Sequence, residues 1–221
     1  MPNLDTSMHL DMLNEFKKGS ALKARLARLF HLGPMNKKVY GIGDWGDPEQ
    51  ADPLKFIRDR YLLPYVKPEQ TALEIGPGGG RWTRYLLPFS KLYVVDYYND
   101  LLRELRKSFH APNMIFIKNN GTDFPGVPQH SVDFIFSFGT FVHLDVPLIE
   151  AYLQNMRGIL RPNGNVVLQY SDKNKIMARE NTGFSENTPE TMRQMALNAG
   201  FRIVEEDLTT MWHSSLMRIA L

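Results

Sequence analysis

The chain has 221 residues, 43% hydrophobic and 23% charged, which is the composition of a globular enzyme with one sizeable core. Its formal net charge of +2 is too small to indicate nucleic-acid binding by itself. The absence of cysteine excludes disulfides, thiolate catalysis and zinc sites with cysteine ligands.

The first 53 residues are predicted to form a helical cap followed by a loop. Residues 5–32 place leucine and phenylalanine at helical spacing and carry several lysines and arginines. These helices could pack on the domain with a solvated basic face, cover the substrate as a lid, or form a homo-oligomer contact. Residues 39–53 are rich in Gly, Pro and Asp and are typical of a loop, in which Tyr40 and Trp45 could cover a bound ligand.

No signal peptide or membrane-spanning stretch is predicted. The first residues are mixed and acidic, and no segment approaches the roughly 20 apolar residues of a membrane span. We therefore expect a cytoplasmic protein without a membrane partner.

Residues 54–221 are predicted to form a second unit in which strands alternate with helices. After a helix at 54–65, we expect strands at 71–75, 92–96, 114–117, 132–138 and 165–170. Helices are predicted between them, at 81–87, 99–109 and 147–160. Apolar strands separated by helices indicate a doubly wound, mostly parallel sheet with helices on both faces.

The end of the chain departs from this alternation. A polar, loop-like segment at 171–188 is followed by a helix at 189–199. Two strands, at 201–207 and 214–220, then lie too close together for a helix to connect them. They must form a hairpin, so we predict seven strands of which the last is antiparallel.

A glycine-rich turn follows the first strand. Glu74 is followed by glycines at 76, 78 and 80, and a helix is expected from Arg81. Glycines let a ligand approach the backbone, and the backbone N–H groups of Trp82 and Thr83 could bind a carboxylate. Since Arg81 stands where the dinucleotide fingerprint has its third glycine, a nucleoside with an amino-acid tail fits better than a pyrophosphate.

Asp96 is the second element of the predicted site. It ends the second strand, twenty positions after Gly76. A carboxylate there can accept hydrogen bonds from both ribose hydroxyls of an adenosine, although it could also cap the next helix. The two features at this spacing are more specific than either alone.

These residues resemble the motifs of the class I S-adenosylmethionine-dependent methyltransferases over 70–221. Residues 74–80 are similar to the family's first motif and Asp96 to its second. The segment 119–125 resembles the third motif, where the family has an Asp that binds the adenine amine. Asn120 occupies that place, and its carbonyl oxygen can accept the same bond.

Two later segments extend the resemblance. Residues 131–138 are similar to the family's fourth strand, and 159–164 to the turn before its fifth. The resemblance implies a Rossmann-like fold that binds S-adenosylmethionine and releases S-adenosylhomocysteine. The predicted cofactor-binding residues are Glu74, Gly76, Pro77, Gly78, Gly80, Trp82, Thr83, Asp96, Asn120, Gly121, Phe138, Tyr40 and Trp45.

His143 is the candidate catalytic base. It follows the fourth strand, at the edge where parallel sheets bind ligands, and Asp145 could orient it. A histidine that only holds the next helix is the alternative, and Tyr170 and Ser171 are weaker candidates to line the site. The histidines show no metal-binding spacing, so no metal is expected.

The predicted function is therefore O-methylation of a small molecule, such as a sugar or secondary metabolite. Small-molecule N-methylation is the nearest alternative. The basic first thirty residues keep an RNA or protein methyltransferase open, although a nucleic-acid partner is disfavoured. A non-catalytic cofactor-binding subunit and a nucleotide-dependent dehydrogenase are further alternatives, and the intact glycine turn and Arg81 respectively argue against them.

Overall fold

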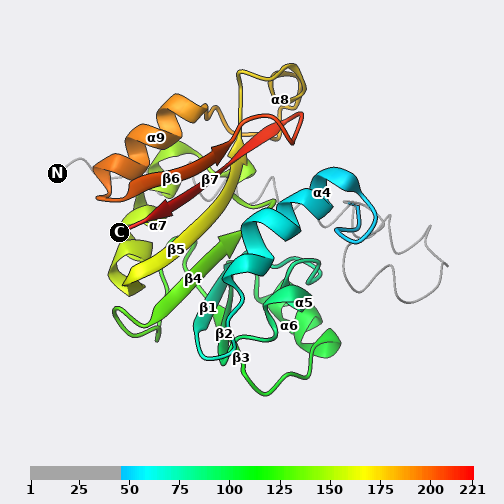
Figure 1. Ribbon diagram of the computed structural model, residues 1–221, viewed down its shortest axis with the longest axis vertical. Coiled ribbons are helices and arrows are strands. Elements are labelled where there is room, and N and C mark those ends of the chain that lie inside the picture. The colour runs from blue at the N-terminus through cyan, green and yellow to red at the C-terminus, as the bar shows by residue number, and fades with distance from the viewer. Residues whose placement is uncertain (1–45) are drawn as a thin grey trace. The chain divides into compact units, whose positions relative to one another are not determined.

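The structure is a computed structural model that describes residues 46–221 (Figure 1). The helices expected within 5–32, together with Tyr40 and Trp45, lie outside this part of the chain. The division at residue 53 stays a prediction. The described end of the loop is packed on the domain, because Asp47 accepts a hydrogen bond of 2.6 Å from the Arg84 guanidinium.

A seven-stranded sheet forms the centre of the described domain, in the order β3-β2-β1-β4-β5-β7-β6. Its strands are β1 (Thr71–Ile75), β2 (Lys91–Asp96), β3 (Met114–Lys118), β4 (Val132–Ser137), β5 (Leu160–Ser171), β6 (Arg202–Asp207) and β7 (Ser214–Ala220). The pairs among β1 to β5 are parallel, whereas β7 is antiparallel to both β5 and β6. The predicted hairpin and reversed last strand are confirmed.

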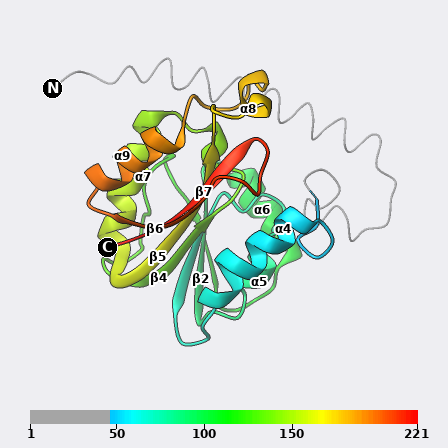
Figure 2. The same ribbon diagram turned by 45° about the horizontal axis from the view of Figure 1, so that its top comes forward.

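Helices cover both faces of this sheet (Figure 2). One face carries α7 (Val146–Ile159) and α9 (Pro189–Asn198), which pack on Leu73 and Ile75 of β1. The other carries α4 (Asp52–Ile57), α5 (Thr83–Leu86) and α6 (Asn99–Ser108), which pack with Ala72 of β1. Because side chains alternate along each strand, two separate apolar cores result.

The predicted strands agree with the structure, the helix expected at 54–65 is confirmed as a run of helical turns, and three local predictions are wrong. The helix expected at 81–87 is the shorter α5, since Gly78 and Gly80 have φ of +55° and +88°, outside the right-handed helical region. The helix at 54–65 is α4 continued by a π-helical turn (Arg58–Leu62) and a 3-10 turn (Leu63–Tyr65) that contains Pro64.

The other two corrections concern β5 and the segment after it. The turn expected before the fifth strand is part of β5, because Leu160 already pairs with Val132. The segment 171–188 contains a short helix, α8 (Ile176–Glu180). The ammonium of Lys173 stabilises its end by donating to the carbonyl of Ala178, and hydropathy patterns do not reveal such a cap.

Among residues 46–221, no helix is long and apolar enough to cross a membrane.

Candidate cofactor and acceptor site

The glycines of the turn after β1 differ in what surrounds them. A side chain at Gly76 would collide with Thr140, and one at Gly80 would collide with the ring of Phe109. Within the described residues, no atom lies within 4 Å of the position that a Cβ would take at Gly78, whose φ is +55°. Gly76 and Gly80 are therefore required by packing, whereas Gly78 leaves the open side of the turn to a ligand.

Glu74, one residue before the end of β1, is a buried carboxyl group, 2% exposed. Its Oε2 accepts a hydrogen bond of 2.6 Å from the Thr83 hydroxyl. Burial, with a smaller contribution from the charge of Asp96, raises the pKa of Glu74 to about 8. Thr83 thus acts on the site through its side chain as well as its predicted backbone N–H, since its hydroxyl holds the carboxyl group in place.

Asp96 lies beside the turn, as predicted. The backbone N–H of Gly76 donates to Val95 O at 2.8 Å, which joins the turn to the end of β2. One Asp96 oxygen accepts a hydrogen bond of 2.7 Å from the N–H of Tyr98. Burial raises the pKa of Asp96 to about 6, although the N–H groups of Tyr98 and Tyr97 oppose this shift. The structure thus brings together Glu74, the glycine turn and Asp96.

Asn120 is exposed and shapes a local turn. Its side-chain oxygen accepts hydrogen bonds from the N–H of Thr122 and the N–H of Asp123, at 3.0 and 3.1 Å. A Cβ at Gly121, whose φ is +109°, would lie 3.5 Å from the ring of Tyr97. The contact of Asn120 with adenine stays a prediction, and the half-buried ring of Tyr97 is a neighbour that the motif comparison did not identify.

An aromatic cluster backs the turn on the other side. Trp82 is 3% exposed, and its ring centroid lies 4.8 Å from that of Phe138. The guanidinium of Arg81 lies over both rings, at 5.5 and 5.4 Å from their centroids. Burial lowers the pKa of Arg81 to about 10, which leaves it charged at neutral pH. Arg81, considered above only as a departure from the dinucleotide fingerprint, thus places a positive charge next to the turn.

His143 lies one 3-10 turn (Phe141–His143) beyond Thr140, the residue packed on Gly76. Its Nδ1 is 2.6 Å from the carbonyl oxygen of Gly183. Because a carbonyl can only accept, Nδ1 carries the proton, and in the neutral ring Nε2 carries the lone pair. The partner at Nδ1 is thus Gly183 rather than Asp145, which precedes α7.

Phe184 and His213 extend the ring cluster around His143. The ring of Phe184 lies 5.4 Å from that of His143 and 5.2 Å from that of His213. All three rings are half-buried. They come from three segments far apart in the sequence, so no local motif could have grouped them.

Gln169 is the residue of β5 that reaches this edge of the sheet. Its Oε1 accepts a hydrogen bond of 2.7 Å from the N–H of Gly139, between Phe138 and Thr140. Tyr170 is fully buried in the core under α7 and α9, and the Ser171 hydroxyl donates to Ser185 O. Gln169, rather than the weaker candidates Tyr170 and Ser171, is therefore the residue of β5 that bonds the loop containing Gly139.

The donor set suits S-adenosylmethionine. An open glycine offers backbone approach, a buried carboxylate can accept from ribose hydroxyls, and Arg81 supplies a charge that complements an amino-acid carboxylate. Within residues 46–221, no group of three or more histidine, aspartate or glutamate residues could hold a metal ion.

A mostly parallel seven-stranded sheet with its last strand antiparallel, flanked by helices, matches the Rossmann-like methyltransferase fold. A family model described as a methyltransferase domain matches residues 72–164. No curated protein matches the chain significantly.

Solved structures share the fold at low sequence identity. An S-adenosylmethionine-dependent methyltransferase from Aquifex aeolicus is 19% identical and aligns over 86% of this chain and 100% of its own, with a TM-score of 0.61. The CcbJ methyltransferase from Streptomyces caelestis is 16% identical over 83% and 96%, with a TM-score of 0.64. The mitomycin 7-O-methyltransferase MmcR is 14% identical over 69% and 49%, with a TM-score of 0.57.

Residues 72–164 thus match a methyltransferase domain, and the fold is that of S-adenosylmethionine-dependent methyltransferases, which implies S-adenosylmethionine as the cofactor.

Proposed function

We propose that this methyltransferase methylates a hydroxyl oxygen of a small molecule and that His143 removes the hydroxyl proton. The observation that carries the proposal is the 2.6 Å contact between Nδ1 of His143 and the carbonyl oxygen of Gly183. This contact fixes the tautomer whose Nε2 can accept a proton. It also anchors the base to the segment between α8 and α9, on the side of the sheet where the cofactor turn lies.

The bound cofactor supplies a methyl group on a sulfonium, from which a neutral thioether leaves without help from an acid. The residues of the chain have to bind the cofactor, orient the acceptor and remove the proton of its hydroxyl group. Asp96 can accept the ribose hydroxyls, the turn at Gly78 admits the tail, and Arg81 can balance its carboxylate. His143 follows Thr140, so the base is attached to the same loop that packs on Gly76.

The surroundings of His143 favour a small acceptor with an apolar or planar part. The half-buried ring of Phe184 lies beside it and that of His213 lies beside Phe184, and these rings can pack against such a molecule. The structural neighbour MmcR is named a mitomycin 7-O-methyltransferase, which agrees with this class of acceptor. A hydroxyl needs a base more than an amine does, and the fixed tautomer of His143 provides one.

The test measures transfer of an isotope-labelled methyl group to a panel of phenols, sugars and amines. We expect O-methylated products, and we expect His143→Asn to lower kcat at least roughly 100-fold without changing affinity for S-adenosylhomocysteine. Asparagine can still donate to Gly183 O, so this variant removes the base and keeps the anchor. His110→Asn, at an exposed histidine after α6, is the matched control.

Other products would redirect the assignment. Labelled amines without labelled hydroxyls would establish N-methylation, and full activity of His143→Asn would make the histidine structural. Methyl transfer to RNA with strongly salt-dependent binding would support the RNA alternative, which draws on the basic residues before position 33. No transfer to any acceptor would favour a non-catalytic subunit.

A further inference from the structure

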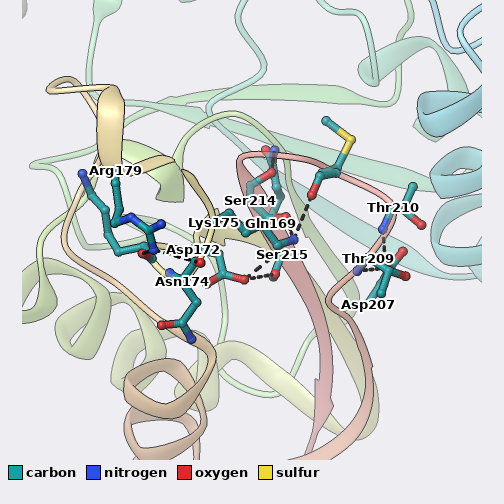
Figure 3. Close-up of polar contacts among 12 residues, drawn as sticks. Gln169, Asp172, Asn174, Lys175, Arg179, Asp207, Thr209, Thr210, Ser214 and Ser215 are labelled. Carbon is teal, nitrogen blue, oxygen red and sulfur yellow. Dashed lines mark hydrogen bonds and ion pairs between the residues drawn. The ribbon is translucent and has the colours of Figure 1, made fainter. Parts of the chain in front are cut away.

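Gln169 of β5 bonds two segments, the loop that contains Gly139 and the start of β7, where Figure 3 shows it beside Ser214. Its side chain is 1% exposed on β5, and its Oε1 accepts from the N–H of Gly139 at 2.7 Å. Its Nε2 donates to the Ser214 hydroxyl at 2.7 Å, at the start of β7. Since the N–H of Gly139 can only donate, the orientation of the amide is fixed by its partners.

Lys175 makes further contacts with the start of β7 and the loop before it, as Figure 3 shows. Its ammonium donates to the carbonyl oxygens of Met211 and Ser214, at 2.8 and 2.6 Å, and lies 3.7 Å from the Asp172 carboxylate. Asp172, 2% exposed, accepts a further bond of 2.6 Å from the Ser215 hydroxyl. Lys175 therefore joins the loop between β6 and β7 to the chain that leaves β5.

The two residues thus connect the cofactor side of the site to the acceptor side. Gly139 is followed by Thr140, which packs on Gly76 and precedes His143 by one turn. Ser214 is preceded by His213, whose ring contacts Phe184. Buried bonds with every partner satisfied make such a connection rigid.

We propose that Gln169 is a positioning residue for methyl transfer, which sets the Gly139–Thr140 loop relative to the wall that carries His213 and Phe184, and that Lys175 keeps this wall in place. The acceptor side of this proposal rests on the proposed function. A polar link inside a sheet is costly unless it is satisfied at both ends, and an apolar side chain would fill β5 equally well. Misplacement of a reacting group by about 1 Å can lower the rate roughly 100-fold, so a link that fixes these two segments can affect catalysis.

The test compares Gln169→Leu and Gln169→Glu in the full chain. Leucine removes both bonds, so we expect kcat to fall at least about tenfold, acceptor KM to rise, and affinity for S-adenosylhomocysteine to change less than about twofold. Glutamate keeps an acceptor for the N–H of Gly139, and its second oxygen can accept the Ser214 proton, so we expect kcat within about threefold of wild type. Asn174→Ala, beside Lys175 but paired with Glu190 at the surface, is the matched control.

A second readout needs no acceptor. Amide hydrogen exchange in the complex with S-adenosylhomocysteine reports directly on the N–H of Gly139, which Gln169→Leu should expose to exchange at least about tenfold faster. Ser214→Ala should leave that amide protected, because only the other end of the link is lost, while acceptor KM still rises. Ser214→Ala therefore still tests the link if Gln169→Leu folds poorly.

Unchanged exchange at Gly139 in Gln169→Leu, or a kcat equal to wild type, would overturn the proposal. So would a loss of activity that merely follows a loss of cofactor affinity, or the same loss in Gln169→Glu. Failure of O-methylation itself would appear in the wild-type protein as a different product, so the two results are distinguishable.

Discussion

Asp96 and Glu74 are two buried carboxyl groups at the ends of neighbouring strands, and each has a separate consequence. Asp96 is expected to bind the ribose hydroxyls, so Asp96→Ala should weaken binding of S-adenosylhomocysteine about tenfold or more by leaving those hydroxyls unpaired. Isothermal titration calorimetry measures this directly. Asp100→Ala, at an exposed position on α6, is the control, and equal affinity in both variants would remove Asp96 from the site.

Glu74 is expected to make the stability of the ligand-free protein fall as pH rises. Its pKa is raised from 4.5 to about 8, so between these values the folded state binds a proton that the unfolded state has lost. The free energy of unfolding should therefore fall by up to roughly 5 kcal/mol over this pH range, at about 1.4 kcal/mol per pKa unit. Asp96, with a pKa of about 6, adds to the same slope.

Glu74→Gln removes this titration and keeps an oxygen that can accept from Thr83. Urea unfolding at a series of pH values should therefore show a flatter profile for the variant than for the wild type between about pH 5 and pH 8. Parallel profiles would show that Glu74 titrates near its ordinary pKa in the folded protein.

Among single residues, the sequence identified those that lie close together along the chain and missed those that only the packing of distant segments brings to the site. Glu74, Gly78 and Asp96 share one short stretch of chain and lie together. Tyr170 and Ser171 were considered and Gln169 was not, because the sequence does not show which side chain of β5 bonds the loop containing Gly139, whereas Tyr170 packs in the core under α7 and α9. Phe184 and His213 depend on contacts across the whole domain.

The glycines in the turn between β1 and α5 have different roles, in packing or in ligand access, and single substitutions can distinguish them. Gly80→Ala forces a Cβ against the ring of Phe109 at a φ of +88°, and should cost about 2–4 kcal/mol of stability in urea unfolding. Gly126→Ala, with φ of +79° and no described atom within 4 Å, is the control and should cost about 1 kcal/mol. Equal losses at both positions would contradict the packing role of Gly80.

Gly78→Ala should behave in the opposite way. We expect a stability loss close to that of Gly126→Ala, because no described atom opposes the added methyl group. Affinity for S-adenosylhomocysteine should fall at least about tenfold, since the methyl group occupies the side left for the ligand. Undiminished affinity, measured by calorimetry, would show that the ligand does not approach Gly78.

The strands were predictable because each is an apolar run bounded by turn residues, whereas the short helices were not. The start of α5 depends on positive φ angles in the turn, and the end of α8 depends on a bond from the Lys173 ammonium to the carbonyl of Ala178. Hydrophobic periodicity contains neither of these local features.

For the domain as a whole, ligand preference is the decisive measurement. S-adenosylhomocysteine binds only the folded protein, so a concentration of 100 times its dissociation constant should add about 2.7 kcal/mol of stability. Differential scanning fluorimetry should show a corresponding rise in Tm, and NAD at the same concentration should give none. A rise with NAD alone would contradict the reading of the glycine turn and favour a dehydrogenase.

The place of β7 between β5 and β6 has a consequence for how the protein is made. On the ribosome, β1 to β5 emerge in an order that lets the cofactor half assemble early, but β5 keeps one open edge until residues 214–220 have been synthesised. A nascent chain at that stage presents a row of unpaired peptide groups on an apolar strand, which invites pairing with another chain. Chaperone capture during translation should therefore concentrate in the interval between completion of β5 and arrival of β7.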